Sequence, residues 1–418
     1  MTAHVSNVYF QLTDLEVSHG KGSVVTTTNG VEYLDFTSGI AVTSTGHSHP
    51  HVVAAIQAQA EKFIHAQVNI FRHDQIGPLA ERLTELTPPG IDTFFFTNSG
   101  AEATESALKL AKQATGRPNL IVFDGSFHGR THMAMAMTMS KTVYRAGHAP
   151  LPSGVFCAPF PYTGRSGDAE ADAVERALAG FDWLLTTQTA PSETAAVMME
   201  PVLGEGGYVP APAAFIQGIA ERCKEHGILY IDDEVQSGFG RAGSMFAIDD
   251  LGVEPDIIVM AKGIASGFPM SAIGMRAELD AKWPTGSHGG TYGGNAIGCA
   301  AALATIDVLT ADGFMANVNE RGDQLRAGLE TLAIDDPTLM TVRGPGLMVA
   351  SEFRHDDRSP DAVRVAAIVA HCREESNLLI MSTGAEGTIV RWMPPLVVSE
   401  AEIDEGLAAF EKALIATR

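Results

Sequence analysis

Two stretches decide the fold, Ile228-Leu-Tyr-Ile-Asp-Asp-Glu-Val-Gln236 and Ile257-Ile-Val-Met-Ala-Lys-Gly263. Each is a short apolar run that leads into charged residues, Asp233 in the first and Lys262 in the second. Apolar runs of this kind, bounded by charge or glycine, are typical of buried parallel strands. Ligands of open α/β sheets bind beyond the carboxyl ends of such strands. We therefore expect Asp233 and Lys262 to meet at one edge of a sheet.

An acid and a lysine at that edge could hold a pyridine ring between them. The carboxylate would pair with the ring nitrogen, and the lysine would form an imine with an aldehyde on the ring. That arrangement binds pyridoxal phosphate. The alternative interpretation is an acidic loop start and an ordinary surface lysine, and the other stretches of the chain have to decide between the two.

Composition bounds the class of protein. A chain of 418 residues can bury a large core and hold two domains. Its 28 Lys and Arg against 50 Asp and Glu give a net charge of −22, which disfavours nucleic acid and anionic membranes as partners. The four cysteines form no CxxC pair, which is typical of reduced thiols. Without an apolar leader or a long apolar stretch, we expect a soluble, cytoplasmic protein.

A repeated strand–turn–helix pattern begins near residue 91 and indicates an α/β fold with a mostly parallel sheet. Strands are predicted at Thr93–Thr97, Leu120–Phe123, Ala195–Met199, Ile228–Ile231 and Ile257–Met260. Helices are predicted within residues 51–87, at Ala213–Glu225, which Gly227 ends, and at about Ala296–Thr310.

The two ends of the chain follow other patterns. Asn29-Gly30 between two apolar segments predicts a β-hairpin. The histidines of Gly46-His-Ser-His-Pro-His51 suggest zinc, but Pro50 breaks a regular strand and no nearby cysteine or acid completes a site, so we predict a loop and no metal. The tail mixes helices with short strands such as Leu347–Phe353 and Thr388–Trp392.

The stretch Phe94-Phe-Phe-Thr-Asn-Ser-Gly-Ala-Glu-Ala103 predicts a buried strand, a turn of small residues and a helix. Free N–H groups at a helix start bind phosphate, and Gly100 and Ala101 are the candidate donors. The alternative is an ordinary turn in which Asn98 or Ser99 caps the helix.

Three more stretches offer site residues, each with a plain structural alternative. Phe127 in Gly125-Ser-Phe-His-Gly-Arg-Thr131 could stack on a pyridine ring or belong to the core, where His128 would be a cap. Gly289-Gly-Thr-Tyr-Gly-Gly-Asn295 offers a hydroxyl and flexible backbone for an anion, or is only a turn. Arg391 lies on a predicted apolar strand and needs a carboxylate, from the protein or from a substrate.

Gly238-Phe-Gly-Arg-Ala-Gly243 matches the dinucleotide-binding pattern GxGxxG. The preceding strand ends too early, and the following segment is too short for a crossover helix. We interpret this match as a turn, which makes a dehydrogenase an unfavoured alternative.

Taken together, the motifs resemble the class III family of pyridoxal phosphate-dependent aminotransferases, over nearly the whole chain. The resemblance rests on these stretches: Tyr33–Phe36, Gly46–Pro50, Asn98–Ala103, Phe127–Thr131, Glu200-Pro201, Gly204–Gly207, Asp233–Gln236, Lys262-Gly263, Gly290–Asn295 and Arg391–Pro395. It implies the fold-type I architecture, with a mostly parallel sheet in a large domain and a smaller α+β domain from both termini. The domains expected are residues 1–50 (arm and part of the small domain), 51–295 (large domain) and 296–418 (connecting helix and C-terminal small domain).

The resemblance also implies how the cofactor is held. Lys262 would carry it as an imine and then move the proton, while Asp233 would keep the ring nitrogen protonated. The other cofactor contacts implied are Gly100 and Ala101 at the phosphate, Phe127 and His128 at the ring, Gln236 at the ring hydroxyl, and Thr291 at the phosphate of a neighbouring subunit. Shared sites of this kind imply a homodimer and leave a tetramer open.

Substrate residues follow from the same resemblance. Arg391 resembles the arginine that binds the α-carboxylate of glutamate or 2-oxoglutarate, and Glu205 the acid that pairs with it. Arg130 matches the arginine that holds the distal carboxylate in 4-aminobutyrate aminotransferases, and Ile40 would line the pocket. The favoured activity is transfer from an ω-amino acid, above all 4-aminobutyrate, to 2-oxoglutarate by a ping-pong mechanism.

Other enzymes with the same fold remain alternatives. They are acetylornithine or ornithine aminotransferases, amine–pyruvate transaminases, glutamate-semialdehyde aminomutases and decarboxylases of dialkyl amino acids. The pair of Glu205 and Arg391 favours alternating donors and so argues against a mutase.

Overall fold

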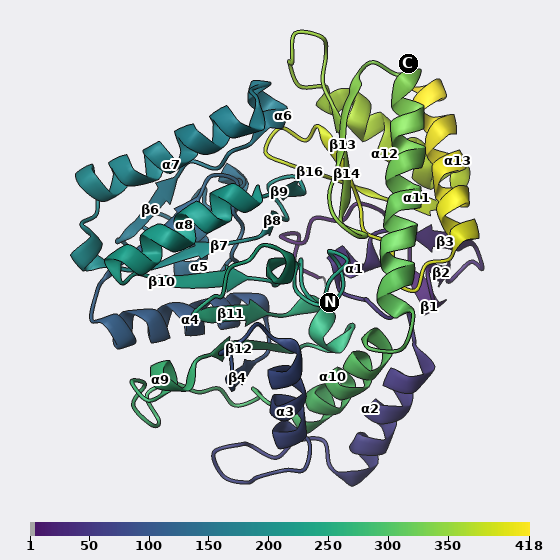
Figure 1. The fold of residues 1–418 in the computed structure, drawn as a ribbon. Coiled ribbons are helices and arrows are strands. Elements are labelled where there is room, and N and C mark those ends of the chain that lie inside the picture. Colours follow the sequence, from purple (N-terminus) through teal and green to yellow (C-terminus); the bar gives the residue numbers. More distant parts are fainter. Residues whose placement is uncertain (1–4) are drawn as a thin grey trace.

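The computed structural model describes residues 5–418, and its centre is a seven-stranded sheet (Figure 1). All strands run parallel except β12, which pairs antiparallel with β11 and β4. In spatial order the strands are β4 (Thr93–Thr97), β12 (Ser271–Met275), β11 (Ile257–Met260), β10 (Leu229–Asp233), β7 (Thr194–Met199), β5 (Asn119–Phe123) and β6 (Val155–Ala158). The predicted α/β class with a mostly parallel sheet is confirmed.

All five predicted strands are present, and two further strands, β6 and β12, were not predicted. The segment of β12, Ser-Ala-Ile-Gly-Met, is fully buried but holds only one β-branched residue, so its sequence carries little strand signal. The strand predicted to end at Ile231 continues to Asp233, which makes the acid its last residue.

Helices cover both faces of this sheet (Figure 1). The covering helices are α4 (Gly100–Thr115), α5 (His132–Met137), α7 (Glu170–Thr187) and α8 (Ala213–His226). Ile231 belongs to the apolar cluster of α4, whereas Tyr230 belongs to that of α7 and α8. Because side chains alternate along a strand, Asp233 lies on the α4 face and Asp232 on the opposite face. The alternation therefore directs Asp233 toward the start of α4.

Three smaller sheets complete the described strands, and one of them is only the pair β8 (Val202–Leu203) and β9 (Val209–Pro210). The first contains β1 (Val17–Lys21), β2 (Val24–Thr27), β3 (Glu32–Asp35) and, from the far end of the chain, β15 (Leu378–Leu379). The second has the order β13 (Leu339–Arg343), β14 (Val349–Phe353), β17 (Ile389–Trp392) and β16 (Met381–Thr383). The antiparallel pair β2–β3 confirms the predicted hairpin.

The remaining helices pack around these sheets. They are α2 (Pro50–Lys62), α3 (Ile76–Leu86), α9 (Ala277–Asp280), α10 (Ala296–Leu309), α11 (Phe314–Ile334), α12 (Ala362–Ser376) and α13 (Glu400–Ala416), with one-turn helices α1 (Ser38–Ala41) and α6 (Thr163–Ser166). The predicted helix at about 296–310 is α10. Residues 51–87 form two helices, with residues 63–75 outside them. The predicted division near residues 50 and 296 stays a prediction.

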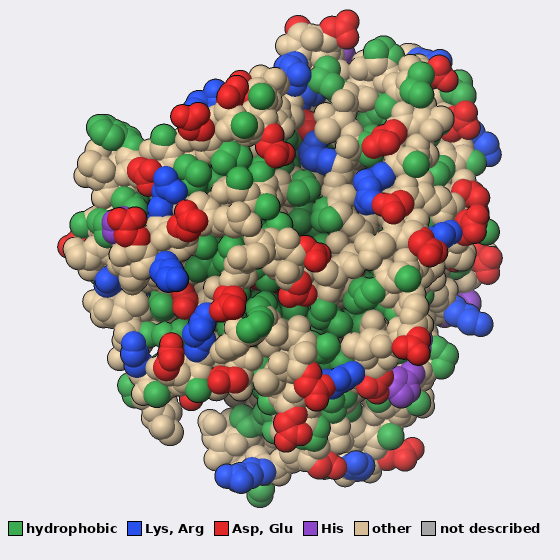
Figure 2. All heavy atoms as spheres, viewed as in Figure 1, with side chains coloured by type: hydrophobic (Ala, Val, Ile, Leu, Met, Phe, Trp, Pro, Cys, Tyr) green, Lys and Arg blue, Asp and Glu red, His purple; other side chains and the backbone are tan. Residues whose placement is uncertain are grey.

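Two features of the sequence take simple structural forms. His47 binds Asp35 through its Nε2 at 2.8 Å, and its backbone pairs with Gly22, so it fastens a loop to the first small sheet. Gly238–Gly243 forms a turn, as we interpreted it. Figure 2 shows acidic side chains spread over the viewed face, with basic ones among them.

Within residues 5–418, no single helix is long and apolar enough to cross a membrane. Among the described helices, only α10 and α11 taken together pass that test of length and composition, and they meet at a bend of 70°.

Candidate active site

A cavity of about 590 Å³ opens at the carboxyl ends of β10 and β11. Eight of the predicted site residues line it: Gly100, Ala101, Phe127, His128, Arg130, Asp233, Gln236 and Lys262. A larger hollow of about 790 Å³ lies at the amino ends of the same strands and contains none of the predicted site residues. The sheet edge that the sequence indicated is therefore where the chemistry-bearing side chains gather.

Asp233 is fixed by two hydrogen bonds at the end of β10. Its Oδ2 lies 2.6 Å from Nδ1 of His128, and its Oδ1 accepts from the N–H of Val235 at 3.0 Å. Both side chains of the Asp233–His128 pair are buried, with exposed fractions of 2% and 0%. A carboxylate held in such a desolvated place strongly stabilises positive charge on a group beside it.

Lys262 begins a short 3₁₀ helix, Lys262–Ala265, directly after β11. Its φ of 45° is in the left-handed region, a strained conformation that clusters at functional sites. The pKa of Lys262 is lowered to about 8, chiefly by burial and also by the nearby charge of Arg391, although Glu205, Glu200 and Asp233 oppose the shift. An amine with a lowered pKa is a good nucleophile near neutral pH.

The start of α4 forms the open end of the cavity. Ser99 caps the helix by accepting from the N–H of Glu102, so the capping role considered for it is real. The N–H groups of Gly100 and Ala101 have no intrahelical acceptor and can bind an anion. Glu102 turns away because its carboxylate accepts from the backbone and side-chain nitrogens of Asn98 at 2.7 and 2.9 Å. The cap and the anion site therefore exist together.

Phe127 and Gln236 are held by residues that sequence reasoning did not assign. The N–H of Phe127 donates to Glu200 at 2.8 Å, and the hydroxyl of Tyr208 donates to Oε1 of Gln236 at 2.7 Å. Burial raises the pKa of Glu200 to about 7, although the charge of His128 partly opposes this. Glu200 comes directly after β7, just as Asp233 is the last residue of β10. Its position at the end of a predicted strand could therefore have marked it as a site residue.

The second group of predicted residues surrounds Arg391 on β17. Arg391 Nη1 donates to Glu205 Oε1 at 2.5 Å, and the Tyr144 hydroxyl donates to Oε2 of the same carboxylate at 3.3 Å. Burial would raise the pKa of Glu205, but the charge and hydrogen bond of Arg391 hold it below its usual value. The predicted pair is thus formed, and the guanidinium is only 4% exposed.

Arg130 contrasts with Arg391. Its guanidinium lies 6.0 Å from the ring centre of Phe127 and 5.8 Å from that of Tyr144. Arg130 is exposed and makes no ion pair with any residue in the range 5–418. Of the two predicted substrate arginines, one is therefore neutralised by the protein and one is available to a ligand.

Ile40 and Thr291 do not line the cavity of the single chain, and neither do Glu205 and Arg391, although Glu205 and Arg391 lie close enough to Lys262 for their charges to act on it. Ile40 is 39% exposed, and its φ of 67° strains a β-branched residue, while Val42 lines the cavity close by. Thr291 lies in the exposed segment 289–292. Their roles stay predictions.

The geometry fits pyridoxal phosphate. A Cβ at Gly100 would lie 3.0 Å from the side chain of Val235, a tight contact that glycine avoids, and Asp233 and Lys262 line the same cavity. An open helix start, a buried acid and a lysine at one sheet edge define a pyridoxal phosphate-dependent enzyme of fold type I. The family model for class-III aminotransferases matches residues 5–414, and the chain belongs to this family.

Known proteins resemble the chain over nearly its full length. It is 39% identical to the 5-aminovalerate aminotransferase DavT of Pseudomonas putida over 405 residues, which covers 96% of this chain and 94% of that protein. It is 40% identical to the 4-aminobutyrate aminotransferase GabT of Escherichia coli, covering 90% and 88%. A PLP-bound amine transaminase from an uncultivated Pseudomonas species has a TM-score of 0.91 at 29% identity, covering 97% and 96%.

The lowered pKa of Lys262 makes a prediction about loading of the apoenzyme. Only the uncharged amine attacks an aldehyde, so incorporation of pyridoxal phosphate should accelerate as pH rises through about 8 and level off above it. Stopped-flow absorbance of apoenzyme mixed with the cofactor measures this rate. A rate that keeps rising toward pH 10.5, the ordinary value for lysine, would contradict the assignment.

Proposed function

We propose that the enzyme transfers the amino group of an ω-amino acid, with 4-aminobutyrate as the favoured donor, to 2-oxoglutarate by a ping-pong mechanism. One observation carries this proposal: Arg391 is neutralised by Glu205, whereas Arg130 has no acidic partner within the described chain. The relatives named for 4-aminobutyrate and 5-aminovalerate support a donor of this class.

The two arginines match the charges of two successive substrates. An ω-amino acid has one carboxylate far from its amine, and Arg130 is free to bind it. Glutamate and 2-oxoglutarate have a second carboxylate beside the reacting carbon, and Arg391 binds it once Glu205 turns away. With Glu205 in place, a donor that lacks this carboxylate does not leave a buried cation unpaired.

Pyridoxal phosphate, when bound, supplies an electron-withdrawing ring that stabilises negative charge at the carbon bearing the amine. Nζ of Lys262 removes the proton from that carbon and returns a proton in the second half of the cycle. The carboxylate of Asp233 favours positive charge on the ring nitrogen, and its bond to His128 fixes its orientation. Gln236, held by Tyr208, would contact the ring hydroxyl.

We also propose a homodimer with shared sites. Thr291 and the neighbouring Tyr292 are exposed in the single chain and so are accessible to a second copy. A cytoplasmic location stays a prediction.

A single-turnover assay tests the donor. The purified holoenzyme is mixed separately with 4-aminobutyrate, 5-aminovalerate, ornithine, N-acetylornithine and an aromatic amine, and the visible absorbance of the cofactor is followed. We expect the fastest change with 4-aminobutyrate and its reversal on addition of 2-oxoglutarate. A faster reaction with ornithine or N-acetylornithine would move the proposal to that branch, and turnover without an oxo acid would refute transamination.

Arg130→Ala should raise KM for 4-aminobutyrate by about 100-fold, because a charge-assisted hydrogen bond to the substrate contributes about 1.5–3 kcal/mol. An aromatic amine without a carboxylate should react almost as fast as before. Arg130→Lys keeps the positive charge but loses the planar guanidinium that can donate two hydrogen bonds to one carboxylate, so an intermediate KM is expected. If the reactions of 4-aminobutyrate and of the aromatic amine were slowed equally, Arg130 would only maintain the shape of the cavity and would not bind the carboxylate.

A further inference from the structure

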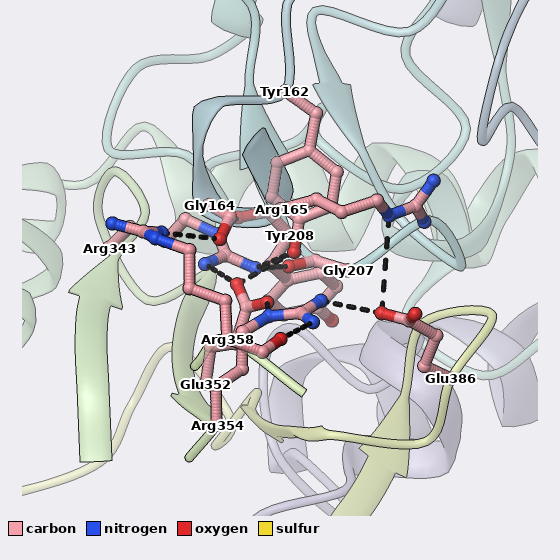
Figure 3. A network of polar contacts seen from close by, with 10 residues as sticks. All are labelled: Tyr162, Gly164, Arg165, Gly207, Tyr208, Arg343, Glu352, Arg354, Arg358 and Glu386. Atoms are coloured by element: carbon pink, nitrogen blue, oxygen red, sulfur yellow. Dashed lines mark hydrogen bonds and ion pairs between the residues drawn. The ribbon is translucent and has the colours of Figure 1, made fainter. Parts of the chain in front are cut away.

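The segment Gly204–Tyr208 carries Glu205 across the second small sheet, and Figure 3 shows the polar contacts around its end. Arg391 on β17 and Arg343 on β13 both pair with Ala350 of β14, one from each side. Directly paired residues of antiparallel strands point to the same face, so the two arginines flank β14 at one level of the sheet. Arg391 binds the side chain of Glu205, and Arg343 binds the backbone of the segment at Gly207 and Tyr208.

Arg343 holds the backbone of this segment by two carbonyl groups (Figure 3). Its Nη2 donates to the carbonyl of Gly207 at 2.8 Å, and its Nε donates to that of Tyr208 at 3.1 Å. Gly207 has a φ of 125°, and a Cβ there would come within 2.5 Å of Ile389. Only glycine therefore allows the segment to lie this close to the sheet.

The guanidinium of Arg343 is itself fixed. Its Nη1 donates to Glu352 at 2.5 Å, its centre lies 5.3 Å from the ring centre of Tyr162, and the Tyr162 hydroxyl donates to Glu352 at 2.7 Å. The Glu352 side chain is 1% exposed. Burial would raise the pKa of Glu352, but the charge of Arg343 and the hydrogen bonds from Tyr162, Arg354 and Arg343 hold it below its usual value.

The other end of the segment is anchored by the turn between β16 and β17. The carbonyl of Glu205 accepts from the N–H of Gly384 at 3.2 Å and from the Thr383 hydroxyl at 3.1 Å. Glu386, in the same turn, binds Arg354 at 2.6 Å, and Arg354 binds Glu352 at 2.6 Å. The backbone around Glu205 is therefore held on both sides, so a movement that releases Arg391 has to come from the side chain of Glu205.

We propose that Arg343 is a positioning residue that sets the choice between substrates with and without an α-carboxylate; this rests on the proposed alternation of Glu205. By fixing the carbonyls of Gly207 and Tyr208, Arg343 keeps the Glu205 carboxylate aligned with Arg391 whenever no α-carboxylate is bound. Without it, the segment shifts and Arg391 is poorly neutralised. The kcat/KM for donors that lack the α-carboxylate then falls more than the kcat/KM for glutamate.

The test compares kcat/KM for the donor half-reactions of 4-aminobutyrate and L-glutamate. Arg343→Met should lower the ratio of the first to the second by about tenfold, the effect expected when hydrogen bonds from a buried charged group are lost. Arg343→Lys should shift the ratio less and keep Tm nearer the wild-type value, because its ammonium still neutralises Glu352. If Arg343→Met does not fold, the Arg343→Lys variant still tests the proposal.

Two controls separate positioning from general stability. Arg117 is a matched arginine that holds the carbonyls of Thr194 and Gly227 at 3.1 and 2.8 Å, far from the cavity, so Arg117→Met should change Tm without changing the ratio. In a Glu205→Ala background, Arg343→Met should no longer shift the ratio, because its effect passes through Glu205.

Either of two results overturns the proposal: equal losses for both substrates in Arg343→Met and Arg343→Lys, or a shift that persists without Glu205. Failure of the donor assignment is distinct, because it is seen in the wild-type enzyme as a lack of reaction with 4-aminobutyrate. The ratio is then measured with the ω-amino donor that the wild-type enzyme accepts.

Discussion

Lys262→Ala should reduce kcat by about 10⁴-fold or more, because the substitution removes both the nucleophile for the cofactor and the group that moves the proton. The largest effects of charge on Lys262 come from Glu205, Arg391, Glu200 and Asp233, and none of these groups is an amine. Single-turnover measurements with a fast donor give the chemical rate directly, and a variant that turns over at the wild-type rate would refute this role.

Binding of the cofactor should persist in Lys262→Ala, because the start of α4 and Asp233 are unchanged. Equilibrium dialysis with pyridoxal phosphate checks this. A small amine added in solution should restore part of the proton transfer, and the restored rate should depend on the pKa of the added amine. Absence of both binding and rescue would point to a disturbed fold, which the Tm would reveal.

The sequence predicted the central elements because their signals are local. Ile257–Met260 is a compact β-branched run, Gly116 ends α4 in the left-handed region, and Asn29-Gly30 closes a hairpin. Asp233 and Lys262 were found for the same reason, since each lies at or just after the end of such a strand. Strand ends are positions that local pattern can locate.

Other parts depend on contacts between distant segments. Tyr144, in the three-residue 3₁₀ helix Thr142–Tyr144, reaches Glu205 across 61 positions, and the hydroxyl of Tyr208 contacts Gln236 across 28. The interior strand β12 is recognisable only by the neighbours it pairs with. Such residues become functional through the arrangement of the sheets, which no short window of sequence contains.

Asp233→Asn should lower kcat by about 10³-fold, the loss found when a preorganised electrostatic group is removed. The amide has almost the shape of the carboxylate and can still accept from Val235, but it carries no charge to favour a proton on the ring nitrogen. The chemical rate should therefore fall much more than cofactor affinity. Single-turnover kinetics and a cofactor titration, run on the same preparation, measure the two effects separately.

Asp232→Asn is the matched control, because Asp232 is the preceding residue of the same strand and is equally buried. It lies on the other face of the sheet, where its two carboxylate oxygens have no hydrogen-bond partner among the described residues. Burial raises the pKa of Asp232 well above its usual value, which favours the neutral acid, and an amide is a neutral replacement of nearly the same shape. Activity should therefore stay close to wild type. Equal losses in the two variants would mean that Asp233 acts through packing, whereas loss in Asp233→Asn alone assigns the effect to a charge on the cavity side of β10.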